Sequence, residues 1–320
     1  MKERRELLGL DEMARVLAPF DLKPRRVRAL DAGTVNAVYR VDTDGGAVFV
    51  RVNQGKSEAD VRYEAALLWH LGARRFPTPQ PLRRGDGMPY VVHCSKYLTV
   101  FPWVAGEAVD EARITVEHAA RIGVLLGRLH RAAADFAPRR DGIYTFERIA
   151  ARWDGIRADP RVAPIAPLVD EEVAWLRASR LPSTSGTIHG DLFADNVLWQ
   201  GPSPIALDFE QASTGRYAYD LAVTLLAWCW DGADLDEART RALAGGYASQ
   251  RPLDDGDRAA LYAESRFAAL RFTVTRLTDV HLPNADRPGK DYRDYLARLQ
   301  RLREMPRDRF ETLLLSGSTP

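Results

Sequence analysis

Acidic, amide and imidazole side chains gather between residues 187 and 210 of this 320-residue chain. His189, Asp191 and Asn196 lie in the run TIHGDLFADNVL, and Asp208 follows Asn196 by twelve residues, in the run IALDFE. An aspartate can accept the proton of a hydroxyl group, and carboxylate and amide oxygens are ligands that Mg²⁺ accepts. These residue types suit a reaction in which a hydroxyl group attacks a phosphate whose charge a metal ion neutralises.

The spacing of these residues is that of the catalytic loop and metal-binding aspartate of kinases, His-x-Asp-x-x-x-x-Asn followed by Asp-Phe. Within the predicted catalytic pair, we expect Asp191 to accept or orient the proton of the attacking hydroxyl group and His189 to brace the loop. We expect Asn196 and Asp208 to bind the Mg²⁺ that bridges the β- and γ-phosphates of ATP. A hairpin between residues 198 and 205 would bring Asn196 and Asp208 to the same end of two strands.

Two other interpretations of this cluster stay open. His, Asp and Asn residues are common in loops that precede strands, so the set could be purely structural. Asp191, Asp195 and Asp208 could also hold metal in a di-carboxylate hydrolase that uses no ATP. The kinase interpretation accounts for the β-rich N-terminal part of the chain as well, and the hydrolase interpretation does not.

The N-terminal part is expected to clamp the nucleotide. Strand-like runs at 36–42 and 47–52 flank an Asp-Gly-Gly turn, which predicts a hairpin. Gly33, in a short turn before the first run, would let the backbone approach a phosphate closely, although an ordinary turn fits the same residue. Two further strand-like runs, at 90–92 and 97–101, follow a helix-like segment.

Two positions near these strands are candidates for contact with ATP. Arg51 on the second strand occupies the place of the kinase lysine that contacts the α- and β-phosphates, and Glu64 on the next helix is its expected partner. Glu58 is a competing partner, and a surface ion pair is the plain alternative. Pro102 and Trp103 follow a strand and precede helical sequence, which suits a hinge that binds adenine or a simple connector.

The pattern of elements predicts an α+β chain with a protein-kinase-like, two-lobe fold. Strand-like runs concentrate before residue 102, and helical periodicity dominates from residue 115 onward. We expect a small, β-rich nucleotide-clamping lobe at residues 1–102. A larger, mainly helical lobe at residues 103–320 would carry catalysis and substrate binding, with ATP in the cleft between the lobes.

Composition limits the partners. The chain has 45 Lys and Arg residues against 44 Asp and Glu residues, and a net charge of +1 gives no general attraction to nucleic acid or membranes. No run reaches the roughly 18 apolar residues of a membrane span, and the N-terminus has no apolar signal segment. Cys94 and Cys229 are expected to be buried, reduced thiols, as in a cytosolic protein. We expect a cytoplasmic monomer or homodimer that acts on a small-molecule hydroxyl substrate.

The motifs HGDLFADN and LDFE resemble those of the aminoglycoside phosphotransferase and choline kinase superfamily. This resemblance implies a kinase-like fold that phosphorylates small molecules and lacks the long activation segment of protein kinases. Asp220 begins a DLA run similar to the family element whose aspartate supports the catalytic loop, so the resemblance implies that structural role. His130 ends a run similar to the family's LGxLH element, which implies packing against the catalytic loop.

Within the superfamily, the chain is most similar to the type II homoserine kinase group. The stretches that carry this likeness are IHGDLFADNVLW, YAYDLAVTLLAWCW, GYASQRPL and AALRFTVTRLTDVH. The likeness implies that ATP and L-homoserine give O-phospho-L-homoserine, a step toward threonine. Choline, ethanolamine, a sugar or an aminoglycoside antibiotic stays open as the acceptor, and so does a non-catalytic, nucleotide-binding pseudokinase.

Homoserine carries a carboxylate and an ammonium group, so its pocket needs a cation such as arginine and an acidic or carbonyl partner. Glu210 and Arg271 are the candidates for these two roles, with a structural ion pair as the alternative for each. Arg276 and Asp279 are three residues apart in one helical segment, and we expect them to pair with each other. A mixed pocket of this kind favours an amino acid, whereas an acidic pocket would favour a polycationic antibiotic.

Overall fold

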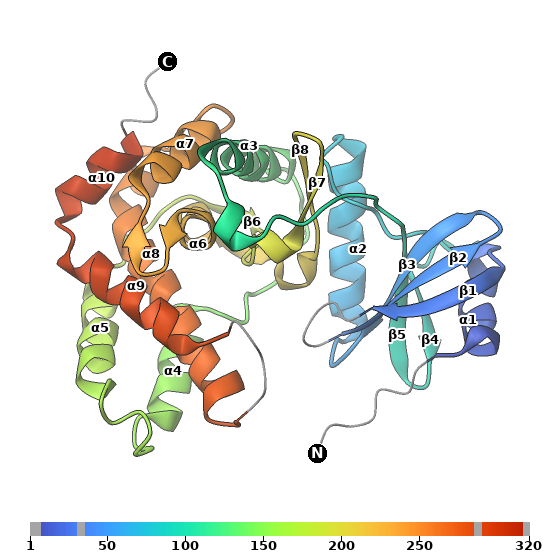
Figure 1. Ribbon diagram of the computed structural model, residues 1–320, viewed down its shortest axis with the longest axis horizontal. Helices are drawn as coiled ribbons and strands as arrows, with labels where there is room; N and C mark the ends of the chain where they lie inside the picture. The colour runs from blue at the N-terminus through green and yellow to red at the C-terminus, as the bar shows by residue number, and fades with distance from the viewer. Residues whose placement is uncertain (1–7, 31–35, 285–289, 316–320) are drawn as a thin grey trace. The chain divides into compact units, whose positions relative to one another are not determined.

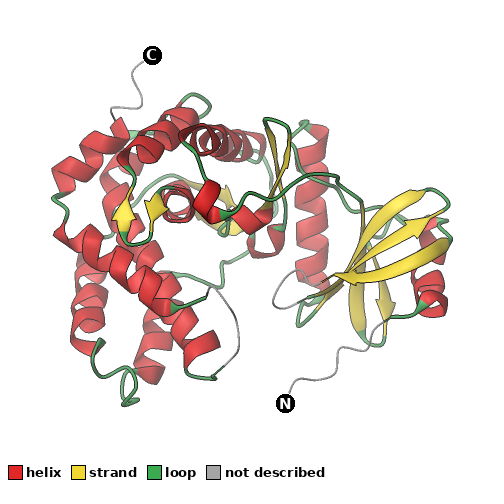
Figure 2. Ribbon diagram, in the orientation of Figure 1, coloured by secondary structure: helices red, strands yellow, loops and turns green. Residues whose placement is uncertain are grey.

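The chain divides into two compact units, Met1–Gly106 and Glu107–Pro320. The computed structural model describes residues 8–30, 36–284 and 290–315, so Gly33 lies outside the described residues. The first unit is built around one antiparallel sheet, and the second is mainly helical (Figures 1 and 2). This arrangement confirms the predicted α+β class.

The sheet of the first unit has the strand order β1-β2-β3-β5-β4. The predicted hairpin is confirmed as β2–β3, where Thr43 pairs with Gly46 and the φ of +110° at Gly46 suits glycine. A second hairpin joins β4 to β5 through Cys94 and Ser95, both of which have positive φ. The elements of this unit are α1 (Leu10–Leu17), β1 (Pro24–Leu30), β2 (Ala37–Thr43), β3 (Gly46–Asn53), α2 (Glu58–Ala73), β4 (Tyr90–His93) and β5 (Lys96–Pro102).

The second hairpin corrects one expectation about the cysteines. Cys94 is exposed because it occupies the turn, whereas Cys229 is buried as predicted, and both are free thiols.

Alternation along β3 separates the core of the first unit from its polar face. Val48, Val50 and Val52 point into a hydrophobic cluster that also contains Met13 of α1. Arg51 therefore points to the other face of the sheet, since successive side chains of a strand alternate.

The second unit consists of helices around the buried helix α6, with short strand pairs between them (Figure 1). All residues from Tyr217 to Leu226 of α6 are buried. The helices are α3 (Val116–Ala132), α4 (Phe146–Ile156), α5 (Ala166–Ser179), α6 (Tyr217–Trp228), α7 (Glu237–Ala248), α8 (Asp255–Arg276), α9 (Tyr292–Glu304) and α10 (Arg307–Leu315). The strands pair as β6 (Ser185–Ile188) with β9 (Ser213–Arg216), β7 (Val197–Gln200) with β8 (Ser203–Ala206), and β10 (Trp230–Asp231) with β11 (Asp234–Leu235).

Helices α3 and α7 approach unusually closely. A Cβ atom built on Gly123 of α3 would lie 2.0 Å from the main-chain oxygen of Leu243, and one on Gly246 of α7 would lie 2.2 Å from that of Ala120. The two helices therefore touch through backbone atoms, and this contact brings His130 of α3 close to Tyr247 of α7. Across the described parts of the chain, no helix is both long and apolar enough to cross a membrane.

Candidate active site

The loop that carries His189 and Asp191 begins where the β6–β9 ladder ends. Ile188 is the last paired residue of β6, opposite Ser213. Gly190 follows with a φ of +77°, a left-handed conformation that is strained for residues with a side chain. The local backbone thus turns sharply and brings Asp191 out of the strand with its side chain partly exposed.

His189 is fully buried and joins the loop to the segment before Asp208. Its Nε2 lies 2.9 Å from the main-chain oxygen of Leu207, and its Nδ1 lies 3.3 Å from the main-chain nitrogen of Asp191. Because Nδ1 accepts the Asp191 N–H, Nε2 is the nitrogen that donates to Leu207. Its ring also packs on Phe209, with centroids 4.6 Å apart. Both ring nitrogens are therefore hydrogen-bonded to backbone groups, which joins the loop to the segment before Asp208.

Asn196 and Asp208 flank the β7–β8 hairpin at its open end, as the sequence predicts. Val197 pairs with Ala206, and the Leu207 N–H donates to the main-chain oxygen of Asn196 at 2.9 Å. The Asn196 side-chain nitrogen donates to the main-chain oxygen of Asp191 at 2.8 Å, which leaves its Oδ1 as the atom that can bind a cation. Asp208 is exposed and adopts a left-handed φ of 54°.

A carboxylate and an amide oxygen at one end of a hairpin fit a hard divalent cation such as Mg²⁺, which binds few protein ligands and keeps several waters. Asp191, Asp195 and Asp208 do not form a multi-ligand cluster, since the described residues contain no group of three or more His, Cys, Asp and Glu side chains that could hold a metal. The donor set therefore suits a metal that is bound together with a phosphate substrate.

Asp220 fixes the backbone of the loop that carries His189 and Asp191. Its carboxylate accepts the backbone N–H groups of His189 at 2.8 Å and Gly190 at 2.7 Å, and it lies 2.9 Å from Nε2 of His130. Burial raises the pKa of Asp220, but the hydrogen bond from His130 and the donors around it outweigh that effect, so the pKa is lowered overall. The carboxylate is therefore ionised and fixes two consecutive backbone groups.

A chain of buried hydrogen bonds continues from Asp220 across α3 to α7. The pKa of His130 is lowered by burial, against the raising effect of Asp220, so the imidazole is neutral and donates from Nε2. Its Nδ1 then accepts from the hydroxyl of Tyr247 at 2.8 Å, and Arg251 donates to the same hydroxyl at 3.1 Å. Arg251 also pairs with Asp257 at 2.6 Å.

Sequence reasoning missed Tyr247 and Arg251. Both lie in the stretch GYASQRPL, which contributes to the family resemblance. No local pattern in the sequence connects either residue to His130.

Arg271 lies beside Asp191. Its Nη1 is 3.5 Å from Oδ1 of Asp191, and its guanidinium lies over the rings of Tyr144 and Phe272, at 3.9 and 3.8 Å from their centroids. Burial lowers the pKa of Arg271, but Tyr219, Asp191 and other neighbours raise it overall, so the side chain is cationic. The structure thus brings one of the two predicted substrate residues to the predicted base.

Glu210 takes a different place, next to Asp208. Its backbone N–H donates to the Asp208 carboxylate at 3.3 Å, and its main-chain oxygen accepts from Arg140 at 2.8 Å. Its side chain is half-buried. The backbone of Glu210 therefore helps to shape the Asp208 turn.

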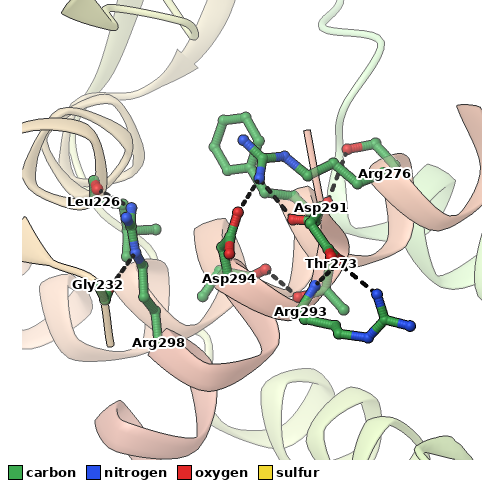
Figure 3. Close-up of polar contacts among 11 residues, drawn as sticks. Leu226, Gly232, Thr273, Arg276, Asp291, Arg293, Asp294 and Arg298 are labelled. Atoms are coloured by element: carbon green, nitrogen blue, oxygen red, sulfur yellow. Dashed lines mark hydrogen bonds and ion pairs between the residues drawn. The ribbon is translucent and has the colours of Figure 1, made fainter. Parts of the chain in front are cut away.

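The expected pairing of Arg276 with Asp279 is wrong. Arg276 donates to the main-chain oxygen of Asp291 at 2.7 Å and to the carboxylate of Asp294 at 3.2 Å (Figure 3). Asp279 instead accepts from Arg152 at 3.1 Å. The helix becomes a π-helical turn at Leu277–His281, which changes the regular spacing on which an i,i+3 pair depends.

Arg298 adds a second fastening of α9. It donates to the main-chain oxygens of Leu226 at 2.6 Å, in the last turn of α6, and of Gly232 at 3.2 Å, in the β10–β11 turn (Figure 3). Helix α9 is thereby tied to both α6 and α8, the helices that carry Asp220 and Arg271.

In the first unit, Arg51 and Glu64 form a buried ion pair. Both residues are 5% exposed, Nη2 of Arg51 contacts Oε2 of Glu64, and Nε donates to Asn53 at 2.9 Å. Glu58 instead pairs with Arg62 at 2.6 Å on the surface.

Pro102 ends β5 opposite Val48, and the Trp103 N–H donates to Ala47 at 3.1 Å. Both residues thus extend the sheet of the first unit.

Comparison with known proteins gives the context of this site. Residues 26–253 match the phosphotransferase enzyme family. A homoserine kinase of Rhodospirillum rubrum is 33% identical over 84% of this chain and 85% of its own length, and one of Phenylobacterium zucineum is 34% identical over 85% of each.

Among solved structures, an amicoumacin kinase in complex with AMP-PNP and Ca²⁺ is similar with a TM-score of 0.70, at 19% identity over 90% of this chain and 89% of its own. A choline/ethanolamine kinase family protein of Mesorhizobium loti has a TM-score of 0.65, at 20% identity over 92% of both chains. These likenesses confirm the predicted kinase-like fold.

Proposed function

This chain belongs to the phosphotransferase enzyme family, as its motifs predict, and we propose that it transfers the γ-phosphate of ATP to the hydroxyl group of L-homoserine. One observation carries the chemistry: Asp191 projects from a loop that the buried Asp220 fixes, beside Asn196 and Asp208 at one end of a hairpin. The names of the curated relatives support homoserine as the acceptor.

In the proposed reaction, Asp191 orients the acceptor hydroxyl and takes up its proton. The hydroxyl oxygen forms a bond to the γ-phosphorus of ATP while the bond from that phosphorus to the β–γ bridging oxygen breaks, which releases ADP. Asn196 and Asp208 would hold Mg²⁺, which neutralises charge on the phosphates when it is bound. His189 and Asp220 keep the loop in place, so that the base is positioned before the substrate arrives.

We propose that the N-terminal lobe, residues 1–102, clamps the nucleotide, with Arg51 on the phosphates and Glu64 orienting it. Gly33, Pro102 and Trp103 remain predictions for contact with ATP. Residues 103–320 would carry catalysis and acceptor binding. We further propose that the protein works in the cytoplasm as a monomer or homodimer, and that its product serves threonine synthesis.

A coupled assay of ADP release tests the proposal. Mg-ATP is offered with L-homoserine, L-serine, choline, ethanolamine and kanamycin, and Asp191→Ala is the matched variant. We expect turnover with homoserine, and a fall in kcat of about 100-fold or more in Asp191→Ala, because general-base assistance is lost. Turnover with another acceptor alone would overturn homoserine and keep the kinase. Failure of every acceptor, together with failure to bind ATP, would overturn the kinase itself.

A further inference from the structure

Three arginines on α8 lie five residues apart, and each stacks on an aromatic ring. Arg266 lies 3.5 Å from the ring centroid of Trp175, Arg271 lies 3.9 Å from that of Tyr144, and Arg276 lies 4.3 Å from that of Tyr295. Aromatic faces hold a guanidinium well, but they do not neutralise its charge. Each of the three therefore needs an anion.

Two of the three arginines have a carboxylate within 3.2 Å. Arg266 donates from Nε and Nη2 to both carboxylate oxygens of Glu172, at 2.8 and 2.5 Å. Arg276 donates to Asp294 at 3.2 Å and to a main-chain oxygen at 2.7 Å.

Arg271 differs from both. Its ion pair with Asp191 is 3.5 Å long, against about 2.7–2.9 Å for a good charged hydrogen bond. Its Nε is buried and has no hydrogen-bond partner among the residues that the structure describes. A buried guanidinium whose N–H donors lack close acceptors destabilises the folded protein. The site is therefore suited to an external anion that approaches Arg271 more closely than Asp191 does.

A second buried donor lies near this fork. The hydroxyl of Tyr219, on α6, is also buried and has no partner within the described parts of the chain. Its ring packs on that of Phe267, which lies one helical turn before Arg271 on α8, with centroids 5.2 Å apart. The region thus offers two unsatisfied donors beside one carboxylate.

We propose that Arg271 is a specificity-determining residue that binds the carboxylate of the acceptor, and that the enzyme selects small hydroxy acids over amino alcohols. The inference rests on the proposed function and narrows its substrate class. The Asp191 side chain is 32% exposed and that of Arg271 is 4% exposed, so an acceptor reaches the guanidinium from the Asp191 side.

Replacement of Asp191 by the acceptor carboxylate at Nη1 of Arg271 would link acceptor binding to catalysis. When the acceptor carboxylate takes the fork of Arg271, the long contact to Asp191 is replaced, and the Asp191 oxygens can face the acceptor hydroxyl. A molecule with its hydroxyl and carboxylate a few carbon atoms apart spans both groups. A fixed cation beside the base also disfavours cationic acceptors that lack a carboxylate.

The test compares acceptors that keep or lack the carboxylate. L-Homoserine, 4-hydroxybutyrate and 3-aminopropan-1-ol are assayed with wild type, Arg271→Met and Arg271→Lys. Arg276→Met is the control, because that arginine of the same helix also stacks on an aromatic ring but already has a carboxylate partner. We expect Arg271→Met to lower kcat/KM for the two carboxylated acceptors by about 10- to 100-fold, mainly through KM, because a charged hydrogen bond is lost.

The other results complete the pattern. The kcat/KM for 3-aminopropan-1-ol should fall by no more than about threefold in Arg271→Met. The Arg271→Lys variant should retain part of the preference for carboxylated acceptors, because the positive charge remains. Arg276→Met should leave the ratios of the three acceptors unchanged. Melting temperatures of all variants report whether each one folds, and the acceptor ratio of the wild-type protein stands independently of any variant.

Each failure has a separate meaning. An equal loss for all three acceptors in Arg271→Met would show that Arg271 only supports Asp191, and would overturn the inference. So would a wild-type enzyme that prefers 3-aminopropan-1-ol to both carboxylated acceptors. A wild type that ignores homoserine but phosphorylates another hydroxy acid, with the same dependence on Arg271, would overturn the proposed acceptor and leave the inference standing.

Discussion

At the scale of single residues, the neutral state of His130 has a measurable consequence. Burial lowers the pKa of His130 below the value of an unfolded chain, which is about 6.5. Below that pH the unfolded chain takes up a proton that the folded protein does not. The contribution of His130 to the free energy of unfolding is therefore fully present at neutral pH. It is lost as the pH falls from about 6.5 toward the pKa of the folded state, by up to about 1.4 kcal/mol per pH unit.

We expect His130→Gln to reduce this dependence. A glutamine can donate to Asp220 and accept from Tyr247 as the imidazole does, but it does not titrate. Urea unfolding of wild type and variant at pH 7.5, 6.5, 5.5 and 5.0 measures the slope, and His70→Gln on α2 of the first unit is the control. An unchanged slope in His130→Gln, or the same reduction in the control, would contradict the assignment.

The placement of Asn196 and Asp208 at one end of a hairpin could be predicted from sequence, but several contacts of the surrounding residues could not. Asp191, Asn196 and Asp208 lie within one short stretch, and their spacing follows from the hairpin between them. Tyr247 contacts His130 across 117 residues of chain, and no local periodicity encodes such a contact. The pairing of Arg276 with Asp294 could not be predicted for the same reason.

At the scale of elements, glycines determine how closely α3 and α7 pack. Gly123 faces the main-chain oxygen of Leu243, and a Cβ atom there would meet backbone that cannot move aside alone. The close approach also brings His130 of α3 to Tyr247 of α7. A methyl group at this position should therefore disturb both stability and the support of the catalytic loop.

We expect Gly123→Ala to lower the free energy of unfolding by about 1–3 kcal/mol, as overpacking does, and to lower kcat as well. Gly155→Ala on α4 is the matched control, because nothing lies within 4 Å of a Cβ built there. That variant should gain about 0.5–1 kcal/mol from its better helix propensity. Urea unfolding and the ADP-release assay measure both, and a Gly123→Ala protein as stable as wild type would refute the packing argument.

Elements with strong side-chain patterns were predictable, and elements held by backbone pairing were not. The β2–β3 hairpin and the helices α2 and α3 follow alternation, periodicity and caps in the sequence. The edge strand β1 was not predicted, because its side chains are half-buried or exposed and its position depends on hydrogen bonds to β2. β9 has the sequence STGR, which carries no strand pattern, and it forms because it pairs with β6.

At the scale of the whole molecule, the proposed function requires groups from both units to bind one nucleotide. Asn196 and Asp208 belong to the second unit, and Arg51 with its buried partner Glu64 belongs to the first. Mg-ATP at about 100 times its Kd should add about 2.7 kcal/mol to the stability of a protein that binds it only when folded. Variants in either unit should therefore diminish this gain.

Arg51→Met tests the contribution of the first unit. Loss of the arginine leaves Glu64 buried without its charge partner, so the variant should lose about 3–5 kcal/mol of stability in the absence of nucleotide. It should also lose most of the rise in melting temperature that Mg-ATP gives to the wild type. Arg62→Met, which breaks the surface pair with Glu58 in the same unit, should change stability little and keep that rise. If Arg51→Met folds and keeps the full rise in melting temperature with Mg-ATP, Arg51 does not contact the nucleotide. Asp208→Ala measured in the same way would then show whether the second unit alone binds Mg-ATP.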